Sequence, residues 1–369
     1  MYPEVGLNLP KTAAYVSTSL KEMGLIVQEG VGNCSGVVGV LEGAHPGKTF
    51  AIRADMDALP ITEETGLPFV SKHRGKMHAC GHDGHMAIAL GAARLLSDMK
   101  KDLYGRVKFI FQPGEEGPGG AKPMIESGVI EDVDAIIALH LGIWNVPAGH
   151  IGIKKGPMMA SMDKFDIEVI GRGGHGAMPH LTVDAVCVAS QIVSALQSIV
   201  SRKVSPTHPA VITVGSMHAG SAFNVIAERA VLEGTTRSLS PVIREQFPEW
   251  IESIVEGTCK GMGADYRFEY SWGYPPLVNE GYFTEFFQAV AEDLLGKDYV
   301  HQLSEPTMGG EDMAFYLEKV PGTFFALGIA SEEGIPFPHH NPRFDIDESA
   351  MWTGTALLSE TAARWLDKN

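Results

Sequence analysis

The chain has 369 residues, of which 44% are hydrophobic and 20% are charged. This composition is typical of a soluble globular enzyme, and the length favours two domains with substantial cores. The formal net charge of -16 argues against nucleic acid and anionic membrane surfaces as partners, because both require a basic face.

The cysteines and the N-terminal residues bear on the cellular compartment. The four cysteines are far apart and form no Cys-x-x-Cys pair, which is typical of a reducing compartment rather than of a disulfide framework. The first residues contain no basic segment followed by an apolar one, so we expect no signal peptide. The sequence contains no run of about 18 uninterrupted apolar residues, so we expect no transmembrane helix. We therefore expect a cytoplasmic protein without a membrane partner.

The first part of the chain alternates between helix-like and strand-like segments. Apolar spacing predicts a helix that ends at Gly24, and a loop at 78–85 leads into another helix. Strands are expected at 36–42, 49–55, 106–112 and 133–142. This alternation predicts an α/β fold with a mostly parallel sheet and helices on both faces.

The pattern changes near residue 160. The segment from Met162 to Tyr274 predicts the order β-α-β-β-α-β, which is the ferredoxin-like arrangement. After Pro275 and Pro276 the α/β pattern resumes and ends in a helix from Asp347. We expect a catalytic domain formed by residues 1–161 and 275–369, with an α+β domain, residues 162–274, inserted into it.

The densest chemical signal lies between residues 78 and 85. His78, Cys80, His82, Asp83 and His85 offer imidazole, thiol and carboxylate groups, which borderline divalent cations prefer. Intervening glycines allow the backbone to turn tightly. A lone histidine is more often an ordinary core or surface residue, but several potential ligands at a loop–helix junction favour a metal site.

Glu115 and Glu116 follow the strand-like segment 106–112 directly. Carboxylates at the carboxyl end of a strand lie where α/β sheets build their sites. Because neighbouring side chains diverge, one carboxylate can bind a metal while the other addresses bound water. Taken alone, the pair would more often be an acidic surface turn.

Three weaker signals also lie after predicted strands or before the last helix. Asp55 and Asp57 lie at the end of the segment 49–55. His140 follows the apolar residues of the segment 133–142, and His340 lies in the loop 338–342. By itself His140 would more often be a core histidine. Together these residues supply enough ligands for two cations at one edge of the sheet.

The segment 171–176 fits the glycine-rich dinucleotide fingerprint G-x-G-x-x-G. That motif requires a helix opening at the glycines and an acidic residue about 20 positions further on. Pro179 delays the helix, and no Asp or Glu occurs between Asp184 and Glu228. We therefore reject a dinucleotide site.

A set of motifs in the same order along nearly the whole chain resembles the M20 metallopeptidase family, most closely its aminoacylase, hippurate hydrolase and indoleacetyl-amino acid hydrolase branch. The motifs are RADMDALP (53–60), HACGHDGH (78–85), GEEG (114–117), ALH (138–140), GGHGAMPH (173–180), FNVI (223–226), GTTR (234–237), GGED (309–312) and HHNPRF (339–344).

The resemblance implies a zinc-peptidase-like catalytic domain, a binuclear metal centre and an inserted ferredoxin-like lid that mediates dimerisation. Two divalent cations (Zn, Mn, Co or Ni) are implied, with Glu115 as general base and Asp57 as the carboxylate that orients a ligand. His175 resembles a lid histidine that reaches a neighbouring subunit's active site, and Asn224 and Arg237 resemble groups that hold the substrate carboxylate. The implied metal ligands are Cys80, His82, Glu116, His140 and His340.

We therefore expect a metal-dependent amidohydrolase that converts N-acyl-L-amino acids (N-acetyl, N-benzoyl or N-arylacetyl) into a carboxylic acid and a free amino acid. The expected partners are this small substrate and a second copy of the chain, in a homodimer or larger homo-oligomer. The alternatives are a dipeptidase or aminopeptidase of the same fold, a catalytically silent metal-binding protein, and a thiol hydrolase with Cys80 as nucleophile.

Overall fold

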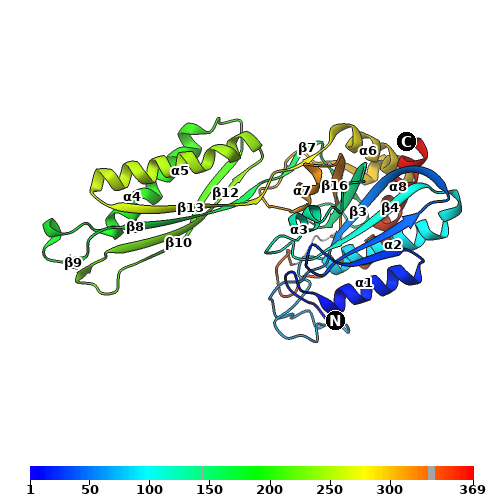
Figure 1. Cartoon of the computed structure of the whole chain (residues 1–369), viewed down its shortest axis with the longest axis horizontal. Coiled ribbons are helices and arrows are strands. Elements are labelled where there is room, and N and C mark those ends of the chain that lie inside the picture. Colours follow the sequence, from blue (N-terminus) through cyan, green and yellow to red (C-terminus); the bar gives the residue numbers. More distant parts are fainter. Residues whose placement is uncertain (143, 331–336) are drawn as a thin grey trace. The chain divides into compact units, whose positions relative to one another are not determined.

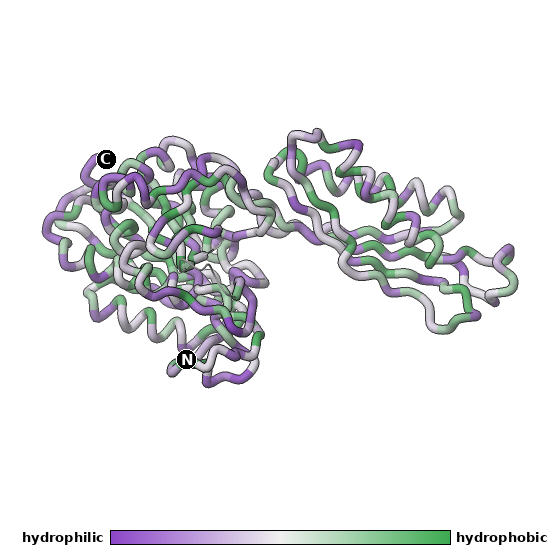
Figure 2. Tube along the Cα trace, turned by 180° about the vertical axis from the view of Figure 1, so that it is seen from behind, coloured by the Kyte–Doolittle hydropathy of each residue, from purple (hydrophilic) through white to green (hydrophobic). Residues whose placement is uncertain are grey.

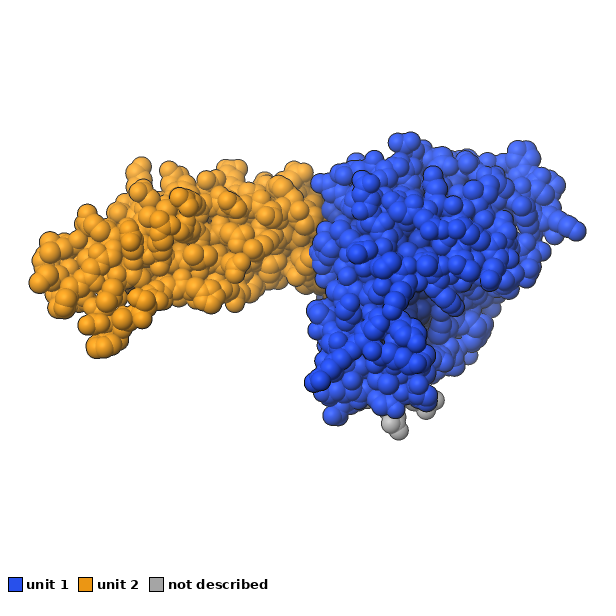
Figure 3. Space-filling model, turned by 60° about the horizontal axis from the view of Figure 1, so that its bottom comes forward, with its two compact units in different colours: residues 1–156, 278–305, 312–369 blue, residues 157–277, 306–311 orange. Residues whose placement is uncertain are grey.

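A computed structural model describes residues 1–142, 144–330 and 337–369. The chain forms two compact units, coloured separately in Figure 3. Unit 1 consists of Met1–Gly156, Val278–Glu305 and Asp312–Asn369, and unit 2 of Pro157–Leu277 and Pro306–Glu311. The chain crosses from one unit to the other after Gly156, Leu277, Glu305 and Glu311, and the first two crossings fall in the short strands β7 (Gly156–Met159) and β14 (Leu277–Asn279).

Unit 1 is built on an eight-stranded mixed sheet with the order β1-β2-β4-β3-β5-β16-β6-β15. The central strands β4, β3, β5 and β16 are parallel, so the mostly parallel sheet expected from the sequence is present. β1 pairs antiparallel with β2, and β2 with β4, whereas β6 pairs antiparallel with β16 and parallel with β15. The strands are β1 (Ile26–Val31), β2 (Gly36–Glu42), β3 (His45–Asp55), β4 (Tyr104–Gln112), β5 (Ala135–Leu141), β6 (Ile151–Ile153), β15 (Val300–Gln302) and β16 (Gly322–Leu327).

Helices cover the sheet of unit 1 (Figure 1). Their apolar sides join a core in which Phe50 of β3 and Phe109 of β4 are fully buried. α2 packs closely against α8, where Gly354 leaves room for Ile88. The helices are α1 (Pro10–Glu22), α2 (His82–Asp98), α3 (Ala121–Glu126), α6 (Gly281–Leu295), α7 (Met313–Leu317) and α8 (Met351–Lys368).

Most predicted segments of unit 1 coincide with observed ones, with small differences at their ends. β3 begins at His45 rather than at residue 49, and the last helix begins at Met351 after a 3-10 turn. The sequence did not predict β1. Its residues are partly or fully exposed, so the strand lacks the alternation of buried and exposed side chains that reveals a half-buried strand.

Unit 2 is a four-stranded antiparallel sheet with the order β10-β12-β8-β13, covered by α4 and α5. Buried and less buried side chains alternate along β8, where Phe165, Ile167 and Val169 face the helices. Apolar and polar stretches accordingly alternate along this part of the chain (Figure 2). The elements are β8 (Met162–Ile170), β9 (Gly174–His175), α4 (Ala185–Ser198), β10 (Ala210–Ala219), β11 (Val225–Ile226), β12 (Arg229–Ser238), α5 (Pro241–Met262) and β13 (Asp265–Tyr274).

The helix formed by α4 and its continuation, Ala185–Lys203, is long and apolar enough to cross a membrane by length and composition alone. Its side chains Val188, Ile192 and Leu196 belong to the core of unit 2. A core helix needs an apolar side of this kind, so packing against the sheet accounts for the composition.

Candidate metal centre

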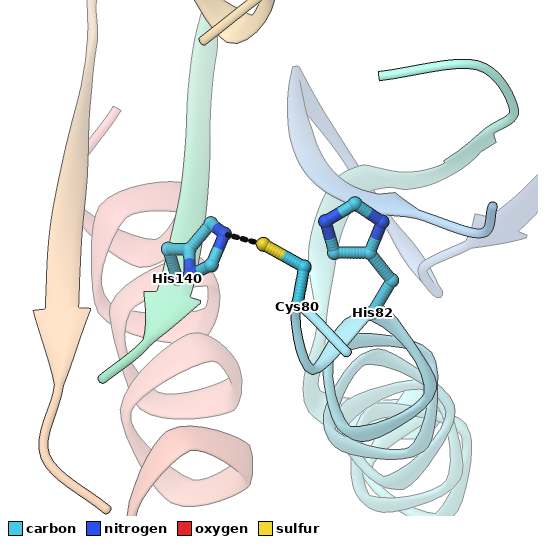
Figure 4. A group of neighbouring side chains, drawn as sticks. All are labelled: Cys80, His82 and His140. Carbon is cyan, nitrogen blue, oxygen red and sulfur yellow. Dashed lines mark hydrogen bonds between the residues drawn. The ribbon is translucent and has the colours of Figure 1, made fainter. Parts of the chain in front are cut away.

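The start of α2 turns sharply at Gly81, which has a φ of 85°. This left-handed conformation favours glycine, because a Cβ atom would be strained there. The turn separates Cys80, in the preceding loop, from His82, the first residue of the helix. Figure 4 shows the result: the thiol lies between the imidazole of His82 and that of His140, which comes from β5.

Cys80, His82 and His140 form the first group of converging ligand atoms, all within 4.8 Å of one another. The sulfur of Cys80 lies 3.5 Å from Nε2 of His140. His82 and His140 are buried, with exposed fractions of 0% and 4%. A thiolate and two imidazoles are typical ligands of a divalent transition metal.

Cys80, Glu116 and His340 form a second group that shares the thiol with the first. Nε2 of His340 lies 3.2 Å from Oε1 of Glu116. His340 has a φ of 63°, an uncommon conformation for a residue other than glycine, and its amide donates to the carbonyl of Ala79. The backbone therefore holds this loop against the Cys80 segment in a strained form, as is common at functional sites.

Glu115 and Asp57 complete the cluster. Oε2 of Glu115 lies 4.0 Å from Nε2 of His82, in a third group that also includes Glu116. The carboxylate of Asp57 accepts hydrogen bonds from the backbone amides of Glu115 (2.9 Å) and Glu116 (3.1 Å). The backbone carbonyl of Asp57 accepts a hydrogen bond from Nδ1 of His82. Asp57 thus links the turn after β4 to the first histidine of α2.

The electrostatics of the cluster favour a bound cation. Burial lowers the pKa of His82, but the charge of Asp55 and the contacts with Asp57 and Cys80 outweigh burial and raise that pKa well above the usual value. Burial and the charges of Glu115 and Glu116 raise the pKa of the Cys80 thiol, against the influence of His82. A site this negative attracts a positive charge, and a metal ion can replace the protons.

Nε2 of His82 is buried and has no hydrogen-bond partner among the residues that the structure describes. Its Nδ1 donates to the backbone carbonyl of Asp57, so once the ring gives up its second proton Nε2 carries the free lone pair. A buried nitrogen without a partner is costly unless a metal or water completes it. The donor set of sulfur, nitrogen and oxygen therefore fits a divalent metal ion.

The remaining predicted site residues lie in unit 2. His175 and Asn224 are brought together, because β9 pairs with β11 and the amide of Gly176 donates to the carbonyl of Asn224. Both side chains are exposed. Arg237 is partly buried beside Gly310, and within the described part of the chain its guanidinium makes no hydrogen bond or ion pair. Burial lowers the pKa of Arg237, against the charge of Asp163.

The sequence did not reveal a buried charge network behind the candidate metal ligands. Arg53, which is 2% exposed, lies between Asp55 (2.7 Å) and Asp312 (2.6 Å). Gln112 donates to Asp312 and accepts from Arg53. The available signal was an arginine inside an apolar strand, since arginine is rarely buried without a partner.

The fold and the donor set define a metal-dependent hydrolase. The pattern of the peptidase family M20/M25/M40 matches residues 51–364. The N-acyl-L-amino acid amidohydrolase of Geobacillus stearothermophilus is 45% identical over 75% of both chains. Thermostable carboxypeptidase 1 of Saccharolobus solfataricus is 39% identical over 100% of this chain and 93% of its own.

A solved structure gives the same result. A dinuclear metal-binding M20 peptidase from Bacillus subtilis is 35% identical, with a TM-score of 0.86 over 100% of this chain and 95% of its own. The chain belongs to the peptidase family M20/M25/M40 and is a hydrolase that acts on amide bonds.

Proposed function

We propose that the protein hydrolyses the amide bond of N-acyl-L-amino acids with the help of two divalent cations. The observation that carries the proposal is the convergence of Cys80, His82, His140, Glu116 and His340 in two overlapping groups, with Glu115 beside them. Five ligands exceed what one tetrahedral site needs, so they support a pair of cations. Zn, Mn, Co and Ni all suit a mixed donor set.

Glu115 is the proposed general base. Its partner Glu116 is assigned to metal, whereas Glu115 is buried at the edge of the ligand groups and held by the Asp57 bond to its amide. When bound, the metal ions lower the pKa of water and polarise the substrate carbonyl. Glu115 takes the proton of the attacking water and passes it to the departing amine.

Unit 2 is the proposed lid and dimerisation domain. Arg237 is partly buried without a described acceptor, and its planar guanidinium matches a carboxylate. Asn224 adds an amide donor, and His175, on the adjoining β9, supplies a donor for the oxyanion of the reaction. These roles require a substrate with a free α-carboxylate beside the scissile bond, as an N-acyl amino acid has.

We propose that the enzyme acts as a homodimer in the cytoplasm. The proposed role of His175 in a neighbouring subunit's site requires a second copy of the chain. A reducing compartment agrees with the state of the four cysteines, which are all free in the structure. It also preserves the thiol of Cys80 as a ligand.

Three rival functions differ in testable ways. A carboxypeptidase would also read a free α-carboxylate, but it would prefer a peptide to a simple acyl group. An aminopeptidase or dipeptidase would instead require a free amino group. A catalytically silent metal protein has no use for Glu115, because binding requires only one of the paired carboxylates.

The deciding experiment is a turnover panel on purified protein of known metal content. N-acetyl, N-benzoyl and N-indoleacetyl amino acids should be hydrolysed, their α-amides poorly, and free dipeptides poorly. Exhaustive chelation should abolish turnover, and one of Zn, Mn, Co or Ni should restore it. Turnover of dipeptides alone, or full activity in demonstrably metal-free protein, would reject the proposal.

A further inference from the structure

The backbone of Leu141, the last residue of β5, forms hydrogen bonds with three histidine side chains. Its amide donates to Nε2 of His85 at 3.0 Å. Its carbonyl accepts from Nδ1 of His140 at 2.9 Å and from Nε2 of His339 at 2.8 Å. One residue thus connects α2, β5 and the loop before α8.

The proton on His85 is fixed by its two partners. The peptide N–H of Leu141 can only donate, so Nε2 of His85 accepts and its proton lies on Nδ1. Nδ1 donates to Asp55 at 2.6 Å, and Arg53 holds the other oxygen of that carboxylate. His85 and Asp55 are 2% and 0% exposed, so solvent does not compete for these bonds.

The carbonyl of Leu141 fixes the two other rings in the same way. A carbonyl can only accept, so His140 carries its proton on Nδ1 and turns the lone pair of Nε2 towards Cys80. His339 donates through Nε2 and packs against the rings of His140 and Phe344, with centroids 5.4 and 4.7 Å away. Its chain neighbour is His340.

We propose that His85 and His339 are positioning residues that set the geometry of the metal ligands through Leu141. His85 fixes the peptide that follows His140 relative to α2, which carries His82. His339 ties the loop of His340 to the same peptide. The inference rests on the proposed ligand set. Residues that hydrogen-bond around metal ligands without binding the metal orient those ligands, and their loss typically lowers metal affinity by about 10- to 100-fold.

The test measures Co(II) binding to metal-depleted full-length protein. Titration gives the affinity, and the visible absorption of bound Co(II) reports the ligand geometry. His85→Leu removes both hydrogen bonds at similar volume, and His85→Gln restores a donor and an acceptor at a similar spacing. His339→Phe keeps the ring contacts and removes the donor. Thr284→Val is the matched control, because Thr284 is buried and hydrogen-bonded to Glu280 and Thr323 away from the cluster.

We expect His85→Leu and His339→Phe to weaken Co(II) binding by about 10-fold or more and to shift the absorption bands. His85→Gln should recover much of both, while Thr284→Val should change only the melting temperature. Unaltered Co(II) affinity and absorption in His85→Leu or His339→Phe would overturn the role of that residue. If His85→Leu cannot be isolated folded, wild-type affinity and absorption in His339→Phe overturn the proposal, whereas weakened binding supports it. Absence of Co(II) binding to the unmodified protein would instead reject the metal site itself.

Discussion

The carboxylate of Asp57 accepts hydrogen bonds from the backbone amides of Glu115 and Glu116, at 2.9 and 3.1 Å. Each carboxylate oxygen serves one amide, so the turn that carries both glutamates is held at two points. The side chain of Asp57 is 1% exposed, which keeps water from replacing either bond. The positions of Glu115 and Glu116 therefore depend on Asp57.

We predict that Asp57→Asn weakens metal binding. The asparagine NH2 group would face an amide N–H, so one of the two bonds to the glutamate turn is lost. Loss of a residue that positions metal ligands through hydrogen bonds typically lowers metal affinity by about 10- to 100-fold. Competitive titration with a chelator of known affinity measures the change. Wild-type affinity in Asp57→Asn would show that one bond suffices to hold the turn.

Glu115→Gln should keep the metal content and lower kcat by at least about 100-fold, because an amide cannot accept the proton of the attacking water. Elemental analysis and steady-state kinetics on the same preparation provide the two measurements. Glu116→Gln is the matched comparison and should lose metal. If Glu115→Gln loses metal instead, the roles of the two glutamates are reversed.

Arg237→Ala should remove the preference for a free α-carboxylate. The unmodified enzyme should favour the acid over the α-amide by roughly 2–4 kcal/mol in kcat/KM if a buried charge pair is formed. The variant should treat both substrates similarly. Arg244, which is already paired with Asp163, offers a control arginine in unit 2. Equal turnover of acid and amide by the unmodified enzyme would exclude Arg237 as the residue that recognises the substrate α-carboxylate.

Mixing two inactive variants tests whether unit 2 acts across subunits. His175→Ala and Glu115→Gln should each be inactive alone. After mixing under conditions that allow subunit exchange, hybrid dimers should contain some sites with both residues intact. Sedimentation or size-exclusion measurements should show dimers. A fully active stable monomer would refute the trans arrangement.

The Lys108–Asp132 pair should contribute to stability at neutral pH. Lys108 is buried and donates to Asp132 and to the carbonyl of Val129. Burial raises the pKa of Asp132, but the Lys108 hydrogen bond and the nearby positive charges outweigh it and lower that pKa. The stabilisation is present above the unfolded pKa of about 3.9 and is lost as the pH falls through the folded value.

Asp132→Asn should therefore destabilise the protein at pH 7 by about 1 kcal/mol, an amount discounted because Asp132 is partly exposed. The difference from the unmodified protein should shrink near pH 3. Thermal unfolding at both pH values measures it. Asp134→Asn is a control that should show a smaller effect, because its carboxylate lies 3.9 Å from the exposed Lys48 and the asparagine oxygen can still accept from the amide of Thr49. A constant difference across this range would contradict the assigned cause.

The local features of the protein could be predicted from its amino-acid sequence. Apolar periodicity located most helices and strands, because burial on one side of an element imposes that period. Ligand chemistry marked Cys80 and His82, since glycine between them allows both to converge. The adjacent carboxylates Glu115 and Glu116 were visible as a pair after a strand. These signals are local, so they required no knowledge of packing.

Which distant residues contact one another depends on the tertiary structure. Arg53 bonds to Asp312, which lies 259 positions away, and His339 bonds to the carbonyl of Leu141, which lies 198 positions away. No periodicity encodes such pairs, because they depend on how strands and loops pack together. Hydrogen bonding at Leu141 also fixed the tautomers of His85 and His140, a property that sequence cannot express because backbone donors and acceptors are the same for nearly every residue.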